Sequence, residues 1–217
     1  MLKGVIFDLD GVITDTSGFH YLCWKRLADE YSVPFDKEFN ERFKGVSRLD
    51  CARMLFPDIK DEEEIERLAN KKNDYYVEMC QQIVPEDIFP GVIEFLSELR
   101  KNNIKTAIGS VSKNTDLVLS RLQVKELFDA IVGGRDIKRS KPAPDVFLLG
   151  AEKLGLDPKD CIVIEDAYAG IEAAHAAGML AVGIGTKENL PIADMVVPSV
   201  KDLSLNDLIE LYNSKAK

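Results

Sequence analysis

The N-terminal stretch reads Gly4-Val5-Ile6-Phe7-Asp8-Leu9-Asp10-Gly11, an unbroken apolar run that passes directly into two acids and an Asp-Gly turn signal. The apolar residues at 4–7 do not alternate with polar ones, as they would in a strand with one face in water. A run of this length is typical of a parallel strand buried on both faces. We therefore predict a buried strand over residues 4–7, with Asp8 and Asp10 at its carboxyl end.

Short runs of the same kind recur in the second half of the chain. They predict strands at 105–108, 130–132, 161–164, 181–184 and 195–197. Segments with helical periodicity, near 113–122, 143–155 and 168–177, separate the first four of these strands. Alternation of strand and helix predicts an α/β fold, a Rossmann-like doubly wound parallel sheet with helices on both faces.

Residues 15–87 break this alternation, because they read as helices with no strand between them. The predicted helices span 17–31, 36–43, 47–56 and 61–84. The simplest arrangement is an α/β core domain formed by residues 1–14 and 88–217, with residues 15–87 inserted as an all-helical cap domain. The two crossings, near residues 14–16 and 86–90, are expected to form a hinge.

Composition limits the partners. The chain has 217 residues, with 28 Lys and Arg against 37 Asp and Glu, and a formal net charge of −9. Nucleic acid and membrane are therefore not expected partners, and a small anionic substrate needs a local basic pocket or a metal. The apolar runs are too short to cross a bilayer. Four cysteines without a CxxC motif, and an N-terminus unlike a secretory signal, predict reduced thiols in a cytoplasmic protein, expected to be a monomer.

Three predicted strands end in polar residues: Asp8 and Asp10 after the first, residues 109–112 after the second, and Glu165 with Asp166 after the strand at 161–164. The carboxyl ends of parallel strands meet at one edge of a sheet, so these residues should converge. Taken singly, such an acid more often caps a loop or a helix. Together, converging carboxylates need a cation, and hard oxygen ligands suit Mg²⁺. The predicted metal ligands are Asp8, Asp10, Glu165 and Asp166, with Asp10 contributing its backbone carbonyl.

Asp8 and Asp10 are candidates for a nucleophile and a general acid and base, because residues two apart can face one cleft in different electrostatic environments. Lys141 is a candidate for neutralising the charge of a transferring phosphoryl group. Ser110 and Asn114 are candidates for donating hydrogen bonds to phosphate. Each has a plainer alternative: Lys141 lies in a stiff helix entry, and Ser or Asn in a turn usually caps it.

The helical insert carries the candidates for substrate recognition. The run Lys44-Gly45-Val46-Ser47-Arg48 places two cations around a turn at a predicted helix N-terminus, where a phosphate could bind. His20 and Trp24 lie four residues apart and so share one helix face. Lys72 could add a contact, although a lysine pair at 71–72 more often marks a solvated face, and a lone histidine is more often structural.

These motifs resemble, in order, those of the haloacid dehalogenase superfamily of aspartate-based phosphotransferases. The run from Phe7 to Thr16 resembles the first motif, Ser110 the second, Lys141 in Ser-Lys-Pro-Ala-Pro-Asp the third, and residues 164–166 with the downstream glycines the fourth. The resemblance spans the chain. It implies that Asp8 becomes phosphorylated, Asp10 transfers protons, Ser110 and Lys141 hold phosphoryl oxygens, and the last acids hold Mg²⁺.

Within the superfamily the chain most resembles the β-phosphoglucomutases, through residues 10–16 with His20 and Trp24, and through runs 44–48 and 72–77. This implies interconversion of β-D-glucose 1-phosphate and D-glucose 6-phosphate through an aspartyl-phosphate, with β-glucose 1,6-bisphosphate as intermediate and activator. The implied substrate-binding residues are His20, Trp24, Lys44, Gly45, Val46, Ser47, Arg48, Lys72, Ser110, Val111, Ser112 and Asn114.

Two positions depart from the pattern of that family. Val111 stands where a smaller alanine is usual, and Ala167 where serine is common. Two other functions stay open at this point: a sugar-phosphate or phosphoglycolate-type phosphatase with the same Asp8 chemistry, and a non-catalytic sugar-phosphate sensor. A dinucleotide-binding protein is disfavoured, because no GxGxxG motif follows the first strand.

Overall fold

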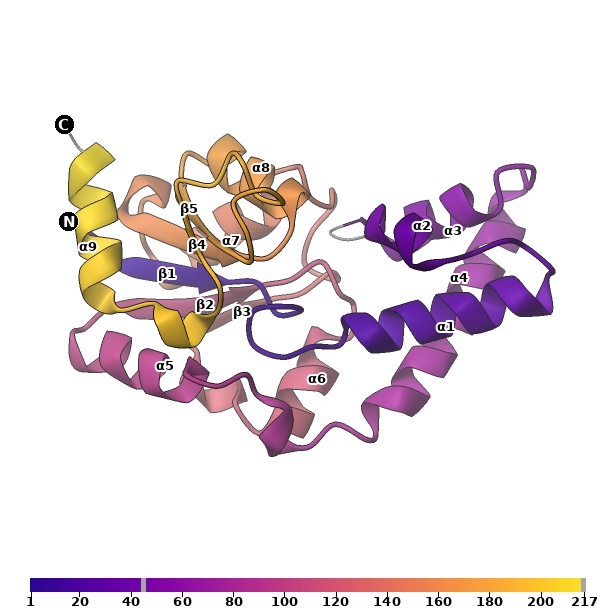
Figure 1. Cartoon of the computed structure of the whole chain (residues 1–217), viewed down its shortest axis with the longest axis horizontal. Helices are drawn as coiled ribbons and strands as arrows, with labels where there is room; N and C mark the ends of the chain where they lie inside the picture. Colours follow the sequence, from indigo (N-terminus) through magenta and orange to yellow (C-terminus); the bar gives the residue numbers. More distant parts are fainter. Residues whose placement is uncertain (44–45, 216–217) are drawn as a thin grey trace.

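The structure is a computed structural model that describes residues 1–43 and 46–215. In the described chain, six parallel strands form one sheet in the order β3-β2-β1-β4-β5-β6 (Figure 1). The strands are β1 (Gly4–Phe7), β2 (Lys105–Gly109), β3 (Ala130–Val132), β4 (Cys161–Glu165), β5 (Leu180–Ile184) and β6 (Met195–Val197). The predicted α/β fold with a doubly wound sheet is confirmed.

Five helices cover the two faces of this sheet: α5 (Val92–Lys101), α6 (Thr115–Leu122), α7 (Asp145–Leu154), α8 (Tyr168–Ala176) and α9 (Leu205–Lys215). Successive strand residues point to opposite faces, so each strand feeds two cores. Phe7 and Ile108 pack with α5, α6 and α9, whereas Ile6, Ala107 and Val163 pack with α7 and α8 (Figure 1). Burial on both faces explains the unbroken apolar run at 4–7.

Four helices lie apart from the sheet and are joined to it by two segments (Figure 1). They are α1 (Ser17–Glu30), α2 (Lys37–Glu41), α3 (Arg48–Leu55) and α4 (Glu62–Cys80). They enclose their own apolar cluster, which includes Trp24, Leu27, Leu55, Ile65 and Leu68. By contrast, three other residues of these helices belong to the core cluster of the sheet: Cys23, Tyr76 and Cys80. The helical part therefore has its own interior and a base that is continuous with the core.

Two helices are shorter than the sequence predicts. The helix predicted over 61–84 ends at Cys80, and the backbone of Val84 is extended, with φ −128° and ψ 161°. Pro85 accounts for the extended backbone of Val84, because the residue before a proline is pushed out of the helical region. Between Cys80 and Val84 the chain makes i→i+3 hydrogen bonds at Gln81, Gln82 and Ile83. The helix predicted over 36–43 spans only Lys37–Glu41, and its end tightens into i→i+3 hydrogen bonds at Arg42 and Phe43.

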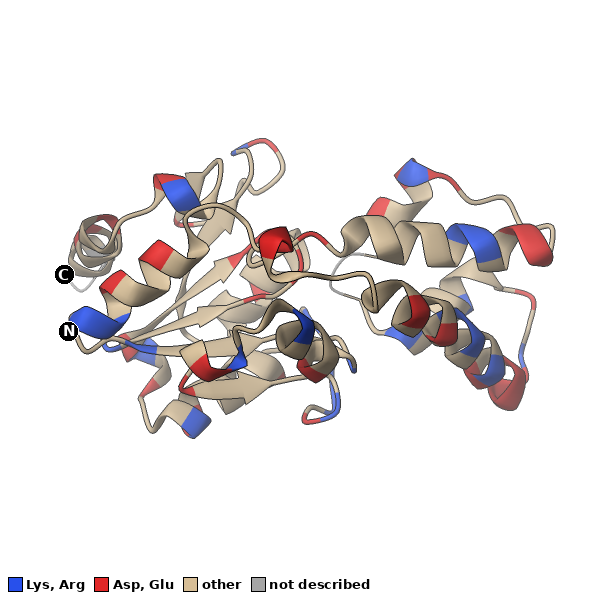
Figure 2. Ribbon diagram, turned by 90° about the horizontal axis from the view of Figure 1, so that it is seen from below, with Lys and Arg blue, Asp and Glu red and all other residues tan. Residues whose placement is uncertain are grey.

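Acidic and basic residues are interspersed over both parts of the molecule (Figure 2). Many form short-range ion pairs, such as Arg53 with Glu62 and Lys71 with Glu30. No helix in the described ranges combines the length and apolar character needed to span a bilayer. Because the charges are interspersed, cations of the described chain do not gather over a whole face of the molecule, and the basic pocket that an anionic substrate needs is expected at a single site.

Candidate active site

The loops that follow β1, β2, β3 and β4 open into one cavity of about 530 Å³, roofed by α1, α3 and α4. This is the edge where the strand order reverses, between β1 and β4, and where ligands bind in open α/β sheets. All the predicted site residues that lie in the described chain line it: Asp8, Asp10, His20, Trp24, Val46, Ser47, Arg48, Lys72, Ser110, Val111, Ser112, Asn114, Lys141, Glu165 and Asp166. Lys44 and Gly45 lie outside the described residues.

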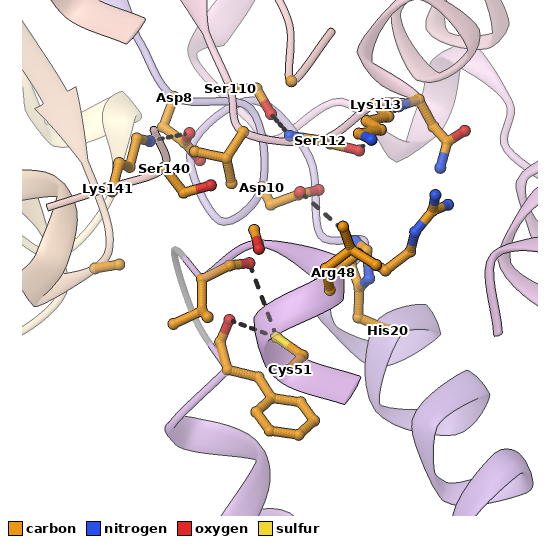
Figure 3. Close-up of a pocket in the computed structure, with 18 of the residues that line it drawn as sticks. Asp8, Asp10, His20, Arg48, Cys51, Ser110, Ser112, Lys113, Ser140 and Lys141 are labelled. Atoms are coloured by element: carbon orange, nitrogen blue, oxygen red, sulfur yellow. Dashed lines mark hydrogen bonds and ion pairs between the residues drawn. The ribbon is translucent and has the colours of Figure 1, made fainter. Parts of the chain in front are cut away.

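A buried ion-pair network forms the floor of the cavity. Lys141 Nζ lies 2.5 Å from Asp8 Oδ1 (Figure 3). It also lies 2.8 Å from Glu165 Oε2, and the Lys141 side chain is 2% exposed. Burial alone would lower the pKa of Lys141, but the charges of Asp8 and Glu165 outweigh it and raise that pKa. Burial and the charge of Asp8 raise the pKa of Glu165 well above its ordinary value. Lys141 therefore carries a fixed positive charge beside Asp8.

Three carboxylates on this floor are close enough to share a cation. One oxygen each from Asp8, Glu165 and Asp166 lies within 4.8 Å of the others. Two glycines make room for them: a Cβ at Gly11 would lie 2.2 Å from Asp166 Oδ2, and one at Gly170 would lie 2.0 Å from Glu165 Cδ. Hard, converging carboxylate oxygens fit a divalent ion such as Mg²⁺. The Asp10 carboxylate is not in this group among the described residues, and the use of its backbone carbonyl as a ligand stays a prediction.

Asp10 occupies a different environment from Asp8. Its carboxylate accepts a hydrogen bond from Thr16 Oγ1, which in turn accepts one from the Tyr76 hydroxyl at 3.0 Å. His20 Nε2 lies 3.8 Å from Asp10 Oδ2. Burial, together with the charge of Asp8, raises the pKa of Asp10 to about 6. A carboxyl group with this pKa can both give and take a proton near neutral pH.

Lys72 lies inside the cavity, not on the solvated helix face that its neighbour Lys71 occupies. Its side chain is 2% exposed, and Nζ is 2.6 Å from His20 Nδ1. The ammonium group lies 5.1 Å from the Trp24 ring centre and 5.0 Å from that of Tyr76. Burial lowers the pKa of Lys72 to about 8, and burial with the Lys72 charge lowers that of His20 well below its ordinary value. His20 is therefore neutral, with Nε2 facing Asp10.

Arg48 reaches from α3 towards the core side of the cavity (Figure 3). Ser47 caps α3 by accepting a hydrogen bond from the Asp50 N–H at 3.2 Å, which fixes the start of the helix. Arg48 Nη2 donates to Asn70 Oδ1 at 3.0 Å, whereas its buried Nε has no hydrogen-bond partner among the described residues. A buried, unpartnered guanidinium N–H is costly without a ligand, so it marks a place for an anion.

The polar residues of the loop after β2 both cap turns and line the cavity. The Ser112 N–H donates to Ser110 Oγ at 3.1 Å and the Asn114 N–H to Ser112 Oγ at 3.2 Å, so these hydroxyls do cap turns. Their side chains also line the cavity. Asn114 Nδ2 donates to Asn73 Oδ1 of α4 at 2.7 Å, a direct link between core and helical part.

Sequence reasoning missed the loop after β3. Arg135 and Lys138 line the cavity, although neither was a candidate. The signal was present, since Gly133 and Gly134 directly follow a predicted strand whose carboxyl end faces the same edge. Carboxylates and hydroxyls at strand ends indicate catalysis more directly than cations do, so this pattern does not single out Arg135 and Lys138. Cys51 also lines the cavity, with its thiol facing the carbonyl oxygens of Phe43 and Val46 (Figure 3).

Comparison with known proteins places this geometry in a family. A family model described as haloacid dehalogenase-like hydrolase matches residues 5–184. The chain is 42% identical over 214 residues to the β-phosphoglucomutase of Bacillus subtilis, covering 96% of this chain and 95% of that one. It is 33% identical to a fructose-1-phosphate phosphatase of Escherichia coli, over 83% of this chain and 95% of the relative.

A solved structure supports the same family assignment. A crystal structure of β-phosphoglucomutase from Clostridium difficile matches with a TM-score of 0.95 and 42% identity, covering 100% of this chain and 99% of the other. The match extends over the sheet, the helical part and the strand ends that carry the acids. The chain belongs to the haloacid dehalogenase-like hydrolase family.

Proposed function

We propose that this chain is a β-phosphoglucomutase, a magnesium-dependent isomerase that interconverts β-D-glucose 1-phosphate and D-glucose 6-phosphate. The observation that carries the proposal is one cavity with a cation at each end: Lys141 beside Asp8 on the floor, and Arg48 on the roof, whose buried Nε has no hydrogen-bond partner among the described residues. A sugar with a phosphate at each end fits between them. The 42% identity to β-phosphoglucomutases in both sequence and structure comparisons supports the same activity.

Asp8 is proposed as the nucleophile. Its carboxylate oxygen attacks the phosphorus of the bisphosphate, the bond from phosphorus to the sugar oxygen breaks, and an aspartyl-phosphate remains. Lys141 and Ser110 stabilise the charge on the phosphoryl oxygens, which is most concentrated when bond making and breaking overlap. The reverse step returns the phosphoryl group to the other hydroxyl of the sugar.

Asp10 is proposed to move the protons. It protonates the sugar oxygen that leaves phosphorus, and it removes the proton from the hydroxyl that attacks in the next half-reaction. A pKa of about 6 suits both directions near neutral pH. The neutral His20, held by Lys72, orients its Nε2 towards this carboxyl group.

The carboxylates of Asp8, Glu165 and Asp166, with the backbone carbonyl of Asp10, are proposed to hold Mg²⁺. When bound, the ion neutralises charge among these carboxylates and the transferring phosphoryl group. The donor set is composed of hard oxygen atoms, and no thiol or imidazole belongs to it in the described chain.

Arg48, with its neighbours Ser47, Val46, Lys44 and Gly45, is proposed to bind the distal phosphate, and Trp24 to cover the sugar. Val111 lies in the cavity lining and would contact the substrate beside Ser112 and Asn114. Because the bisphosphate presents a phosphate at either end, one set of cap residues can serve both halves of the cycle.

The phosphorylated Asp8 must react with sugar rather than water. A thousandfold preference corresponds to about 4 kcal/mol of transition-state free energy. We propose that residues 15–87 close over residues 1–14 and 88–217 when sugar binds, which excludes water and assembles Asp10. The contact between Asn114 and Asn73 supports such closure, because it joins the two parts at the cavity mouth.

A phosphatase is the second candidate, with water as the acceptor of the phosphoryl group from Asp8. The 33% identity to a fructose-1-phosphate phosphatase and the 29% identity to a phosphorylated carbohydrates phosphatase of Thermotoga maritima favour it. Both functions share the floor of the cavity. They differ in whether the helical part lets water or only a sugar hydroxyl reach the phosphorylated Asp8.

One assay separates the two. The protein is supplied with β-D-glucose 1-phosphate, Mg²⁺ and a trace of β-glucose 1,6-bisphosphate, and glucose 6-phosphate and free phosphate are followed together. A mutase produces glucose 6-phosphate in large excess over phosphate, whereas release of phosphate alone rejects the mutase. Asp8→Asn is the control: retention of activity in that variant would rule out covalent transfer through Asp8.

We also propose a cytoplasmic location and a monomeric state. The four cysteines, Cys23, Cys51, Cys80 and Cys161, are all buried and free, which suits a reducing compartment. The substrate class is a small phosphorylated sugar, and the net charge of −9 disfavours nucleic acid.

A further inference from the structure

The loop after β3 is fixed against the loop after β2. The Gly134 N–H donates to the Ser112 carbonyl at 2.8 Å, and the Asp136 N–H donates to the Gly133 carbonyl at 2.9 Å, which closes a turn around Arg135. The Asp136 carboxylate accepts a further hydrogen bond from the Gly133 N–H at 2.8 Å. The backbone of Arg135 is therefore held beside the residues that line the core side of the cavity.

Glycine at position 134 makes this approach possible. A Cβ there would lie 2.0 Å from the Val111 carbonyl oxygen and 2.7 Å from its carbon, both backbone atoms that cannot move aside cheaply. The two loops therefore pack in backbone contact. The next residue, Arg135, is exposed and lines the cavity, as does Lys138 three residues on.

Charge is unevenly distributed over the lining of the cavity. The acids among its described lining residues are Asp8, Asp10, Glu165 and Asp166, all at the strand ends after β1 and β4. The remaining charged lining residues are cations: Arg48 and Lys72 from the helical part, and Lys113, Arg135, Lys138 and the floor residue Lys141 from the core. Away from these two strand ends, the charged residues of the described lining are therefore all positive, in a chain whose net charge is −9.

The cations of the lining come from both sides of the hinge, and the charges of Arg48 and Arg135 interact. Burial lowers the pKa of Arg48; the charges of Asp74 and Glu66 oppose this shift, and the charge of Arg135 adds to it. Two guanidinium groups that repel each other across a cavity gain from an anion between them. By contrast, the neighbouring Arg139 is paired with Asp145 at 2.6 Å and does not line the cavity.

We propose that Arg135 and Lys138 form a core-side subsite for the outer phosphate of the bisphosphate, which keeps this intermediate bound while the cap is open. The inference rests on the proposed mutase function. For the second half-reaction the bisphosphate must turn end over end, and this requires the cap to release it. Arg48 and Lys72 leave with the cap, whereas Arg135 and Lys138 stay with the core and with Lys113.

The subsite has a specific kinetic signature. A monophosphate that accepts the phosphoryl group from Asp8 turns its hydroxyl to the floor, so its own phosphate also lies at the outer end of the cavity. Loss of the charges of Arg135 and Lys138 should therefore raise both the bisphosphate concentration for half-maximal activation and the KM for β-D-glucose 1-phosphate, by up to roughly tenfold, because two exposed ion-pair contacts are removed. The signature of retention is a rise in the amount of bisphosphate that escapes into solution per turnover.

The test compares Arg135→Gln, Lys138→Gln and the double variant with wild type, all in Mg²⁺. The matched control is Lys101→Gln, which removes one exposed positive charge at the end of α5, outside the cavity. Arg135→Lys preserves the charge and should retain most of the wild-type behaviour. The bisphosphate that escapes into solution per turnover is measured by phosphorus NMR after quenching, and the double variant should release more.

A binding experiment distinguishes failure of the proposed subsite from failure of the proposed mutase function. Binding of β-glucose 1,6-bisphosphate to Asp8→Asn protein is measured by calorimetry with and without the Arg135 and Lys138 substitutions, at low and moderate salt. Wild type that makes no glucose 6-phosphate refutes the mutase, whereas unchanged bisphosphate binding refutes the subsite. Escape of bisphosphate at the wild-type level in the double variant would also overturn it, because the two charges would then attract anions without retaining the intermediate.

Discussion

Lys141 carries its charge where a lysine would ordinarily be neutral. Burial opposes that charge, and Asp8 with Glu165 restores it. The reverse is also true: the two carboxylates tolerate one another because Lys141 lies between them. Each member of such a network depends on the others, so removing one leaves an uncompensated buried charge.

Replacement of Lys141 by Met should therefore affect both stability and activity. In metal-free buffer we expect Lys141→Met to lose about 3–5 kcal/mol of unfolding free energy, because Asp8 and Glu165 lose their buried counter-charge. Mg²⁺ should restore part of this loss, but mutase activity should stay at least about a thousandfold lower. Urea unfolding with and without Mg²⁺ measures the first effect. Lys125→Met, which breaks an exposed pair with Asp116, serves as the control and should change stability by less than about 0.5 kcal/mol. Equal stability of the two variants would contradict the network.

The lowered pKa of Lys72 predicts that folding stability depends on pH. The pKa is lowered from 10.5 to about 8, mainly by burial. Between these values the unfolded chain holds a proton that the folded chain has lost, so folding stability rises with pH in this window. The unfolding free energy of wild type relative to Lys72→Met should therefore increase from about pH 8 towards pH 10. Denaturant titrations at several pH values measure it, and a flat difference would show that Lys72 is not desolvated.

At the scale of elements, the sequence predicts the strands and the acids at their carboxyl ends, because both depend on patterns of neighbouring residues. An unbroken apolar run at 4–7 needs two covered faces, and the carboxyl ends of parallel strands share an edge. The burial of Lys72 was harder to foresee, since Lys71 beside it is solvated. Its position nevertheless falls on the buried stripe of α4, which includes Ile65, Leu68, Ala69 and Tyr76. Arg135 depends on a contact between two loops, which no periodicity encodes.

Helix α8 gives a prediction at this scale. Gly170 lies in its first turn, where alanine would favour the helix by about 1 kcal/mol. A Cβ there would, however, lie 2.0 Å from the Glu165 carboxyl carbon. Gly170→Ala should displace that carboxylate and raise the Mg²⁺ concentration for half-maximal activity by roughly tenfold or more, the loss of one ligand contact. Gly18→Ala in α1 is the matched control, because nothing lies within 4 Å of its added Cβ. If both variants titrate with Mg²⁺ like wild type, the glycine is not needed to seat Glu165.

For the whole molecule, the two crossings between core and helical part are bonded to each other. The Phe89 N–H donates to the Ile13 carbonyl at 2.9 Å, and Thr14 Oγ1 donates to the Asp87 carbonyl at 2.8 Å. Paired in this way, the crossings can bend together without separating. Beside the crossings, the hydrogen bond between Asn73 and Asn114 joins the helical part to the core within the lining of the cavity. A paired hinge and a breakable contact between the two parts are what a swinging cap requires.

Scattering tests this arrangement. With Mg²⁺ and a non-transferable phosphonate analogue of β-D-glucose 1-phosphate, we expect small-angle X-ray scattering to give a smaller radius of gyration than that of the free protein. The free protein should be more expanded, because one hydrogen bond of about 1 kcal/mol at the mouth is too weak to hold the cap closed without ligand. Asn73→Ala should need more analogue to reach the compact state, whereas Asn206→Ala on α9, which removes a hydrogen bond to Glu210, should behave as wild type. Identical compactness in the free and bound protein would mean that water is excluded without any movement of the cap, and selection of sugar over water would then have to come from the fixed walls of the cavity.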